Sequence, residues 1–285
     1  MSMATALKRC QTSTSLFRAD WPPMTVTDVP SAVDSLLACE SNRVSRSRIT
    51  EEWDGLDLAT AYTVQRELVA AKIARQGDAV IGTKLGLTSV AKQQRMGISS
   101  PLTAVLLKSY VLKQGALLPL DRLIQPRVEP ELVFTMKKKL QGPGVTTEDV
   151  LDAIDKVYAG FEVIDSRYHA YSFALPDVVS DNASSALFIV GEVGIDAANI
   201  DLINEHVAIS KNDEFVYEAT GEAVQGNPAY ALALAVNELA ERGQFVDAGE
   251  IVLTGGMTDA VPIGPGDTIS AVFSNLGTLS VTATI

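Results

Sequence analysis

Two apolar segments that carry acidic residues decide the fold class: QPRVEPELVF at residues 125–134 and GFEVIDSRY at residues 160–168. Side chains alternate between the two faces of a strand, so Glu129 and Glu131 share one face if the first segment is extended. Glu162 joins them if the second segment forms a neighbouring strand. Because a buried carboxylate without a cation is costly, the pattern predicts a metal ion or a basic partner inside a β-rich core.

Three carboxylates form a set of hard oxygen ligands of the kind that Mg²⁺ or Mn²⁺ prefers. Zinc and copper sites usually contain His or Cys, and the chain has only two residues of each type. An isolated Glu-x-Glu is more often the solvated face of a strand. The apolar neighbours of these acids favour burial, and we therefore predict that Glu129, Glu131 and Glu162 hold Mg²⁺ or Mn²⁺.

The composition is that of a globular chain with an ample core, since 47% of its 285 residues are hydrophobic and 20% are charged. The net charge of -12 repels nucleic acid and anionic membrane surfaces, so we predict neither as a partner. No apolar run reaches the ~18 residues that span a bilayer. Both cysteines lie within the first forty residues, which favours a reducing, cytoplasmic location over a disulfide framework.

The pattern of elements divides the chain into three parts. Residues 1–29 are predicted to be a flexible extension, and Met24 is an alternative start. Residues 30–78 are predicted to form a helical amino-terminal subdomain, because apolar residues recur at helical spacing. In residues 79–285, short β-rich segments alternate with Gly, Pro and Asn, which predicts a strand-dominated core. The expected fold class is α+β.

Two helices are predicted to interrupt this core, each with a clear start. Thr146 with Asp149 three residues later resembles a capping box. Asn227 before Pro228 supplies an N-cap and a proline at the first helical position, and Gly243 marks the end of that helix.

A basic side chain accompanies the acidic motif. Lys84 lies in the run IGTKLGLTS, where Gly82 and Gly86 would allow a ligand to approach the backbone closely. An ammonium group in these apolar surroundings needs an anion, either one of the three glutamates or a bound carboxylate or enolate. Arg167 either pairs with Asp165 or reaches a substrate carboxylate.

Two polar runs are further candidates. Ser184 lies in VVSDNASSA, which either binds the waters of a metal ion or simply forms a turn. Thr254, Gly255 and Gly256 lie in LTGGMTDAVP at the end of a predicted strand, where free backbone N–H groups would suit a carboxylate, although a tight turn explains the glycines equally well. The phosphate-binding and nucleophile-elbow motifs GxGxxG, GxxxxGK[ST] and GxSxG are absent from the sequence.

Six runs together resemble the fumarylacetoacetate hydrolase superfamily, and more narrowly its bacterial branch of 2-oxopent-4-enoate hydratases and 4-oxalocrotonate decarboxylases. In chain order they are GTKLGLTSVAKQQRMGISSP, QPRVEPELVF, GFEVIDSRYHAYSF, VVSDNASSA, GNPA and VLTGGMTDAVPIGPGD. The resemblance covers about residues 50–285 and implies a mixed β-rich roll or barrel, in which the predicted β-rich part, residues 79–285, is the catalytic core. It also implies that Glu129, Glu131 and Glu162 are the Mg²⁺ or Mn²⁺ ligands and that Lys84 lies beside the substrate.

The same resemblance implies a small-molecule 2-oxo acid as the substrate. It further implies a homo-oligomer and a complex with a hydratase of the same pathway. The residues that we expect to contact the substrate are Arg167, Ser184, Thr254, Gly255 and Gly256.

One position separates the two activities of this branch. Hydratases typically carry Pro-Asp-Phe-Gly, and that Asp transfers a proton during the addition of water; here Leu102 follows Pro101. Leucine cannot transfer a proton. The resemblance therefore favours metal-dependent decarboxylation of 4-oxalocrotonate to 2-hydroxypenta-2,4-dienoate and CO₂, a lyase reaction of aromatic meta-cleavage catabolism. Leu102 would exclude water and disfavour the charged departing carboxylate.

Three alternatives remain open at this point: a 2-oxopent-4-enoate hydratase, an acylpyruvate-type C–C hydrolase and a non-catalytic partner of a hydratase. The hydrolase needs a base that activates water, for which His169 and His206 are poorly placed. Glu222 and Gln225 stand where relatives usually have small or apolar residues, and as candidates for the pocket wall they would point to a different 2-oxo acid.

Overall fold

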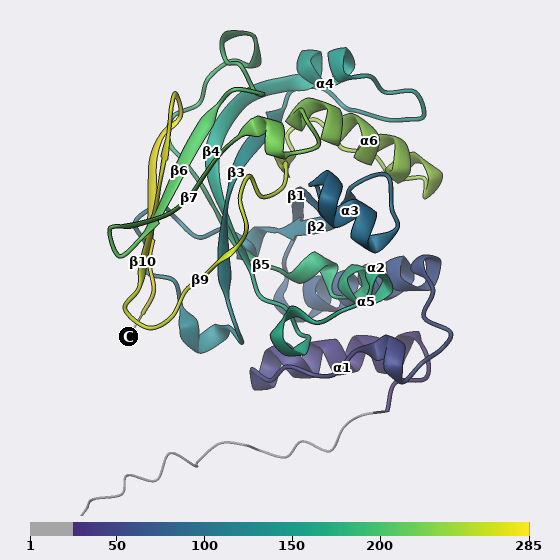
Figure 1. Cartoon of the computed structure of the whole chain (residues 1–285). Helices are drawn as coiled ribbons and strands as arrows, with labels where there is room; N and C mark the ends of the chain where they lie inside the picture. Colours follow the sequence, from purple (N-terminus) through teal and green to yellow (C-terminus); the bar gives the residue numbers. More distant parts are fainter. Residues whose placement is uncertain (1–24, 285) are drawn as a thin grey trace, which may run out of the picture.

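The structure is a computed structural model that describes residues 25–284 (Figure 1). Most of the predicted extension, including Met24, lies outside these residues. The last part of that extension belongs to the folded unit, because Val26 is fully buried and the first helix begins at Val29. None of the described helices is both long and apolar enough to cross a lipid bilayer.

A large mixed sheet forms the centre of the molecule. Its strands run in the order β2-β1-β8-β3-β4-β5, and β9 pairs with β3. The β1–β8 pair is parallel, and the other pairs are antiparallel. The strand bounds are β1 (Val80–Gly86), β2 (Leu102–Leu107), β3 (Arg127–Met136), β4 (Ile154–Ile164), β5 (Ser185–Val190), β8 (Ile251–Leu253) and β9 (Val261–Pro262).

A smaller antiparallel sheet of four strands packs beside the large one (Figure 1). Its order is β11-β10-β6-β7, with bounds β6 (His206–Lys211), β7 (Glu214–Thr220), β10 (Thr268–Phe273) and β11 (Gly277–Thr282). Inward-facing residues of both sheets share one apolar core with the buried face of helix α6. Representative members are Phe134, Phe161, Ile209, Leu232, Ile269 and Leu279.

The helices begin and end at residues that the sequence marks. Their bounds are α1 (Val29–Asn42), α2 (Leu58–Gln76), α3 (Val90–Met96), α4 (Thr147–Ala153), α5 (Leu175–Ser180) and α6 (Pro228–Glu241). The predicted capping box at Thr146 and Asp149 is present, and the Asn227 side chain accepts a hydrogen bond from the Ala229 N–H. Helix α4 stops at Ala153, because the following apolar residues enter strand β4.

The two amino-terminal helices pack against the rest of the chain. Helices α1, α2 and α5 lie together in Figure 1, and they bury one shared apolar cluster. The cluster includes Leu36 of α1, Leu68 of α2, Val179 of α5 and Leu102 of β2. The helices that the sequence predicted in this region are therefore present, and their apolar faces are covered by later parts of the chain.

An asparagine side chain links the two edges of the curled large sheet. Strand β2 lies at one edge and β5 follows the 182–184 turn at the other. The Val105 N–H donates to Asn182 Oδ1 and Asn182 Nδ2 donates to the Val105 carbonyl, both at 2.9 Å. Asn182 thus pairs with β2 as a strand residue would, which turns the open sheet into a nearly closed half-barrel.

Replacing Asn182 by Ala should destabilise the fold by about 2–3 kcal/mol, because two buried backbone groups of Val105 lose their partners. Asn182 also has φ 49, a left-handed conformation that asparagine tolerates better than alanine. Urea unfolding of the Mg²⁺-loaded proteins measures the change. Asn42→Ala, which removes an exposed side-chain bond at the end of α1, is the matched control and should cost less than 1 kcal/mol.

Candidate metal centre and active site

The three glutamates meet because β3 and β4 are antiparallel neighbours. Glu129 and Glu162 are direct Cα partners, and Glu131 is opposite Gly160. Strand alternation places Glu129 and Glu131 on one face. One carboxylate oxygen from each of the three acids can lie within 4.8 Å of the others. The structure therefore brings together the set that the sequence singled out.

Two of these carboxylates are buried without enough hydrogen-bond donors. Glu131 is 0% exposed and Glu162 is 1% exposed. Glu131 Oε2 accepts a hydrogen bond of 2.7 Å from the Gly255 N–H, whereas Glu131 Oε1 and Glu162 Oε1 accept none from any residue in the described part of the chain. Such oxygen atoms fit a hard divalent cation, which takes several oxygen ligands at once.

The electrostatics of the cluster also favour a positive charge beside it. Burial raises the pKa of Glu131 well above its usual value, and the neighbouring Glu162 and Glu129 raise it further. Burial raises the pKa of Glu162 as well, against the opposing effect of Lys84. A divalent cation bound between these oxygens would stabilise their ionised forms.

Lys84 supplies one positive charge to this cluster from strand β1. Its Nζ lies 2.8 Å from Glu162 Oε2 and donates a 2.9 Å hydrogen bond to the Ala183 carbonyl. The side chain is buried. Of the anions that the sequence left open, the structure thus pairs Lys84 with a glutamate of the cluster. Gly82 serves packing and not a ligand, since a Cβ there would lie 1.9 Å from the Ile251 carbonyl oxygen of β8.

The turn that receives Lys84 has an unusual backbone. Asn182, Ala183 and Ser184 have φ values of 49, 49 and 58, all in the left-handed region. Such conformations are costly for residues with a Cβ and persist only where surrounding contacts fix them. Here Asn182 is bound to β2, and Ser184 Oγ donates to Asp181 Oδ2 at 3.2 Å. The turn points the Ala183 carbonyl at the ammonium group.

Arg167 lies behind this turn and does not line the cavity that contains Lys84. Its guanidinium is buried, donates to the Asp181 carboxylate and carbonyl, and donates to the Asp165 carbonyl at 2.8 Å. The Asp165 carboxylate instead accepts bonds from the backbone of Ile124 and Gln125. The sequence left two roles open for Arg167: an ion pair with Asp165 or contact with a substrate carboxylate. The structure shows neither the bond to the Asp165 carboxylate nor a guanidinium that faces the cavity.

The glycine-rich turn after β8 surrounds the acids. Thr254 is buried, and its Oγ1 donates to the Leu132 carbonyl at 2.9 Å. The Gly255 N–H binds Glu131, and Gly256 lies against Glu129, where a Cβ would come within 2.9 Å of the carboxylate carbon. Of this group, Gly256 is the one that lines the cavity. The backbone N–H expected to bind a substrate carboxylate is used by a carboxylate of the protein.

A cavity of about 650 Å³ opens above the cluster and collects five of the predicted residues: Lys84, Leu102, Glu129, Ser184 and Gly256. Leu102 is opposite Gly86 on β1, so it lies on the same sheet face as Lys84. Sequence reasoning missed several other members of the wall, namely Arg48, Thr88, Lys92, Arg127, Tyr171 and Tyr217. One signal could have identified Arg127, because strand alternation places it on the same face as Glu129.

Glu222 and Gln225, which the sequence suggested as pocket residues, do not line this cavity. Glu222 is exposed, and Gln225 Oε1 accepts a 2.5 Å hydrogen bond from Gln93 of α3. Both lie in the connection between β7 and α6, and that connection turns towards α3. The altered residues therefore give no reason to expect a different substrate.

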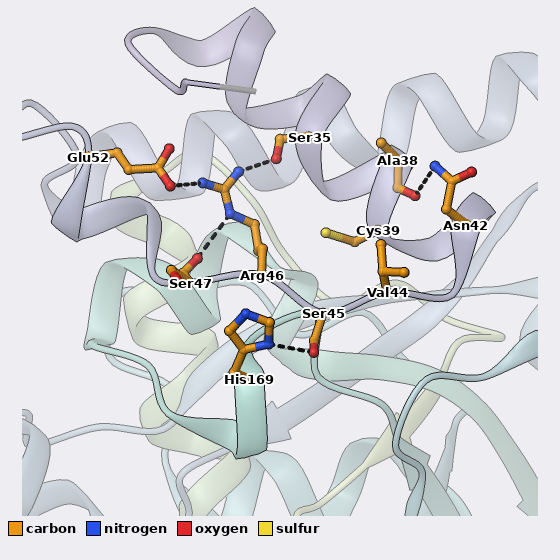
Figure 2. Close-up of a pocket in the computed structure, with 10 residues that line it drawn as sticks. All are labelled: Ser35, Ala38, Cys39, Asn42, Val44, Ser45, Arg46, Ser47, Glu52 and His169. Atoms are coloured by element: carbon orange, nitrogen blue, oxygen red, sulfur yellow. Dashed lines mark hydrogen bonds and ion pairs between the residues drawn. The ribbon is translucent and has the colours of Figure 1, made fainter. Parts of the chain in front are cut away.

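A second, smaller cavity lies between α1 and the segment of residues 44–47 (Figure 2). Figure 2 shows His169 at its wall, where the ring Nδ1 lies 2.7 Å from Ser45 Oγ. Arg46 bonds to Ser35 and to Glu52 in the same view. Neither His169 nor His206 lines the cavity above the glutamates, so neither histidine is placed to activate water there.

Comparison with known proteins identifies the family. A family model described as the C-terminal part of fumarylacetoacetate (FAA) hydrolase matches residues 79–284. The chain belongs to the fumarylacetoacetate hydrolase family. This match confirms the family resemblance and the fold class that the sequence motifs predicted.

Similarity to individual members of the fumarylacetoacetate hydrolase family extends beyond that region. A 4-oxalocrotonate decarboxylase of Pseudomonas sp. strain CF600 is 41% identical over 82% of this chain and 88% of its own length. A 2-hydroxyhexa-2,4-dienoate hydratase of Comamonas testosteroni is 37% identical over 82% and 89%. A structure of 4-oxalocrotonate decarboxylase from Pseudomonas putida G7 with magnesium and adipate has a TM-score of 0.86 and 36% identity, and covers 90% of this chain and 97% of that one.

The raised pKa of Glu131 predicts how stability depends on pH. In the metal-free protein this group keeps its proton at pH values where the unfolded chain, with a glutamate pKa of about 4.3, has lost it. The stabilisation that protonated Glu131 contributes is therefore complete below the pKa of the unfolded chain. It is lost as the pH rises through the pKa of Glu131 in the folded protein. In EDTA at pH 8, Glu131→Gln should be more stable than wild type, because the amide has no charge to bury.

Mg²⁺ should reverse this order, because glutamine is a poorer ligand than carboxylate. Thermal unfolding at pH 5 and pH 8, in EDTA and in Mg²⁺, tests both statements. The exposed Glu214→Gln is the control and should follow wild type throughout. An E131Q variant that is less stable than wild type in EDTA at pH 8 would contradict the interpretation of the cluster as a cation site.

Proposed function

We propose that this protein is a divalent-metal-dependent lyase that converts 4-oxalocrotonate (2-oxohex-3-enedioate) into 2-hydroxypenta-2,4-dienoate and CO₂. One observation supports this proposal above the others. An apolar residue, Leu102, lies on the same face as Lys84 in the cavity above the three glutamates, at the position where hydratases of the branch carry an acid.

The cation that we propose is Mg²⁺ or Mn²⁺, held by Glu129, Glu131 and Glu162. When bound, this cation would coordinate the carboxylate and ketone oxygens of a 2-oxo acid and draw electron density towards them. Lys84 adds a fixed positive charge at the same wall, where it stabilises the negative charge that develops on the dienolate. Because Lys84 is held by both Glu162 and the Ala183 carbonyl, its charge is oriented before substrate binds.

The carbon–carbon step needs no acid or base from the protein. The bond between C5 and the distal carboxylate carbon breaks, its electron pair passes through the conjugated alkene to the C2 oxygen, and CO₂ leaves. The Leu102 side chain gives the cavity an apolar surface on the same sheet face as Lys84, and this surface excludes water from the dienolate product. An acid at position 102 would instead be able to protonate the product and promote its hydration.

The five residues expected to contact substrate divide into two groups. Ser184 and Gly256 line the cavity, and we propose them as substrate-contacting residues. Arg167, Thr254 and Gly255 act through the protein: their bonds fix Asp181, the backbone of β3 and Glu131, respectively. A homo-oligomer, an association with a hydratase that consumes the product, and a cytoplasmic location remain predictions from the sequence.

The purified protein should release CO₂ from 4-oxalocrotonate in the presence of Mg²⁺ or Mn²⁺ and should leave 2-hydroxypenta-2,4-dienoate unchanged. Anaerobic assays of both compounds, with and without metal, measure CO₂ and the ultraviolet absorbance of each. Consumption of the dienoate without release of CO₂ would identify a hydratase instead. The 37% identical hydratase makes this the second candidate.

Leu102→Asp should introduce measurable hydratase activity on 2-hydroxypenta-2,4-dienoate and slow decarboxylation, because the carboxyl group can transfer a proton and admits water. Leu102→Asn is the matched control, since it has a similar size and polarity but no titratable group. It should lose decarboxylase activity without gaining hydratase activity. A folded, metal-binding L102D variant with no hydratase activity would count against the role of Leu102.

A further inference from the structure

The cavity is rich in cations, and most of them already have an anionic partner. The cationic side chains of its wall are Arg48, Lys84, Lys92, Arg95 and Arg127. Lys84 is paired with Glu162 at 2.8 Å, Lys92 with Asp259 at 3.6 Å and Arg48 with Glu51 at 3.9 Å. Arg95 is exposed in the last turn of α3.

Arg127 differs from the other four. It is half-buried, and within residues 25–284 no carboxylate oxygen lies within 4 Å of its guanidinium nitrogens. A partly desolvated guanidinium gains most from a planar anion that accepts two parallel hydrogen bonds. The cavity thus presents one half-buried arginine whose preferred partner is a carboxylate from outside the chain.

Two contacts hold this guanidinium in place. Its central carbon lies 4.1 Å from the centre of the Tyr171 ring. The Tyr171 hydroxyl donates to the carbonyls of Ile164 at 2.8 Å and Gln125 at 3.1 Å, so the ring itself is fixed. Ile164 is also the Cα partner of Arg127 across β3 and β4. The stack therefore orients the guanidinium before any ligand arrives.

The strand sets the separation between Arg127 and the acids. Arg127 precedes Glu129 by two residues on β3, so both side chains project from one face with about 7 Å between their Cα atoms. The terminal carbons of an extended six-carbon dicarboxylic acid are roughly 6 Å apart. A 2-oxo acid whose oxygens lie at the glutamate cluster can therefore reach the guanidinium with a second carboxylate.

We propose that Arg127 binds the distal carboxylate of the substrate and so selects dicarboxylic 2-oxo acids over monocarboxylic ones. This inference rests on the proposed function, because it assumes that the 2-oxo acid end lies at the glutamates. The apolar side chains of Leu102, Ile164 and Val178 line the cavity, and we place the carbon chain between the two charged ends against them. No other part of the described cavity wall offers an unpaired, half-buried cation on that face.

The contact has a specific kinetic consequence. In the proposed complex, Arg127 pairs with the distal carboxylate of the substrate. This carboxylate loses its negative charge as it becomes CO₂. The ion pair is therefore no stronger in the transition state than in the substrate complex, and it contributes to binding more than to the chemical step. Loss of Arg127 should therefore raise KM for 4-oxalocrotonate at least 10-fold and should not lower kcat.

The test compares two unreactive 2-oxo acids of equal length on the Mg²⁺-loaded protein by calorimetry. One is 2-oxohexanedioate, which ends in a carboxylate, and the other is 2-oxohexanoate, which ends in a methyl group. Wild type should bind the dicarboxylate at least 10-fold more tightly. Arg127→Gln should lose that preference while its affinity for 2-oxohexanoate stays within twofold, and Arg127→Lys should keep part of it. Arg75→Gln, at an exposed position of α2, is the control and should match wild type.

Three results would overturn the proposal. Equal binding of both acids by wild type would exclude a carboxylate subsite. An equal loss of affinity for both acids in R127Q would place the arginine at the 2-oxo acid end, which the two acids share. An unchanged preference in R127Q would assign the distal carboxylate to another cation. These three results are interpretable when the wild type binds both acids in a Mg²⁺-dependent manner. A wild type that binds neither acid would overturn the proposed function together with this inference.

Discussion

The structure depends on one electrostatic constraint, which is the placement of three carboxylates on one face of the β3–β4 pair, two of them buried. Glu129 and Glu162 are direct neighbours across the strand pair, and Glu131 is next to them on the same face. Their mutual repulsion must be offset by positive charge or by hydrogen-bond donors. Lys84 and the Gly255 N–H supply part of this compensation, and the unbonded oxygens that remain define the space for a divalent cation.

Much of the surrounding chain serves to hold that compensation in place. The left-handed turn of residues 182–184 directs a carbonyl to Lys84, and its strained backbone is fixed by Asn182 on one side and by the buried Arg167–Asp181 pair on the other. Burial raises the pKa of Asp181 to about 6, against the opposing effect of Arg167. Because these contacts also join β2 to β5, the closure of the sheet and the geometry of the active site are parts of one network.

We propose that the wall of the cavity, and not this framework, sets the choice of reaction. Family members with the same fold include decarboxylases and hydratases, so the glutamate cluster and Lys84 do not separate the two activities. Under this proposal, the two activities differ in whether a proton donor lies above the cluster, at position 102. Leu102 gives this cavity an apolar surface, and Arg127 gives it a half-buried cation two residues before Glu129 on β3. Under our two proposals, Leu102 sets the reaction type and Arg127 the choice of substrate.

The sequence alone determined the features that rest on local chemistry: the strand alternation that aligns Glu129 with Glu131, the helix starts at Thr146 and Asn227, and the family. It did not determine which charged side chains meet in the folded chain. Arg167 was expected near substrate and instead binds Asp181, and Arg127 was not selected although it lines the cavity. The physical reason is that a charged side chain takes whichever opposite charge the fold brings within hydrogen-bonding distance, and that distance is set by strand register and tertiary packing.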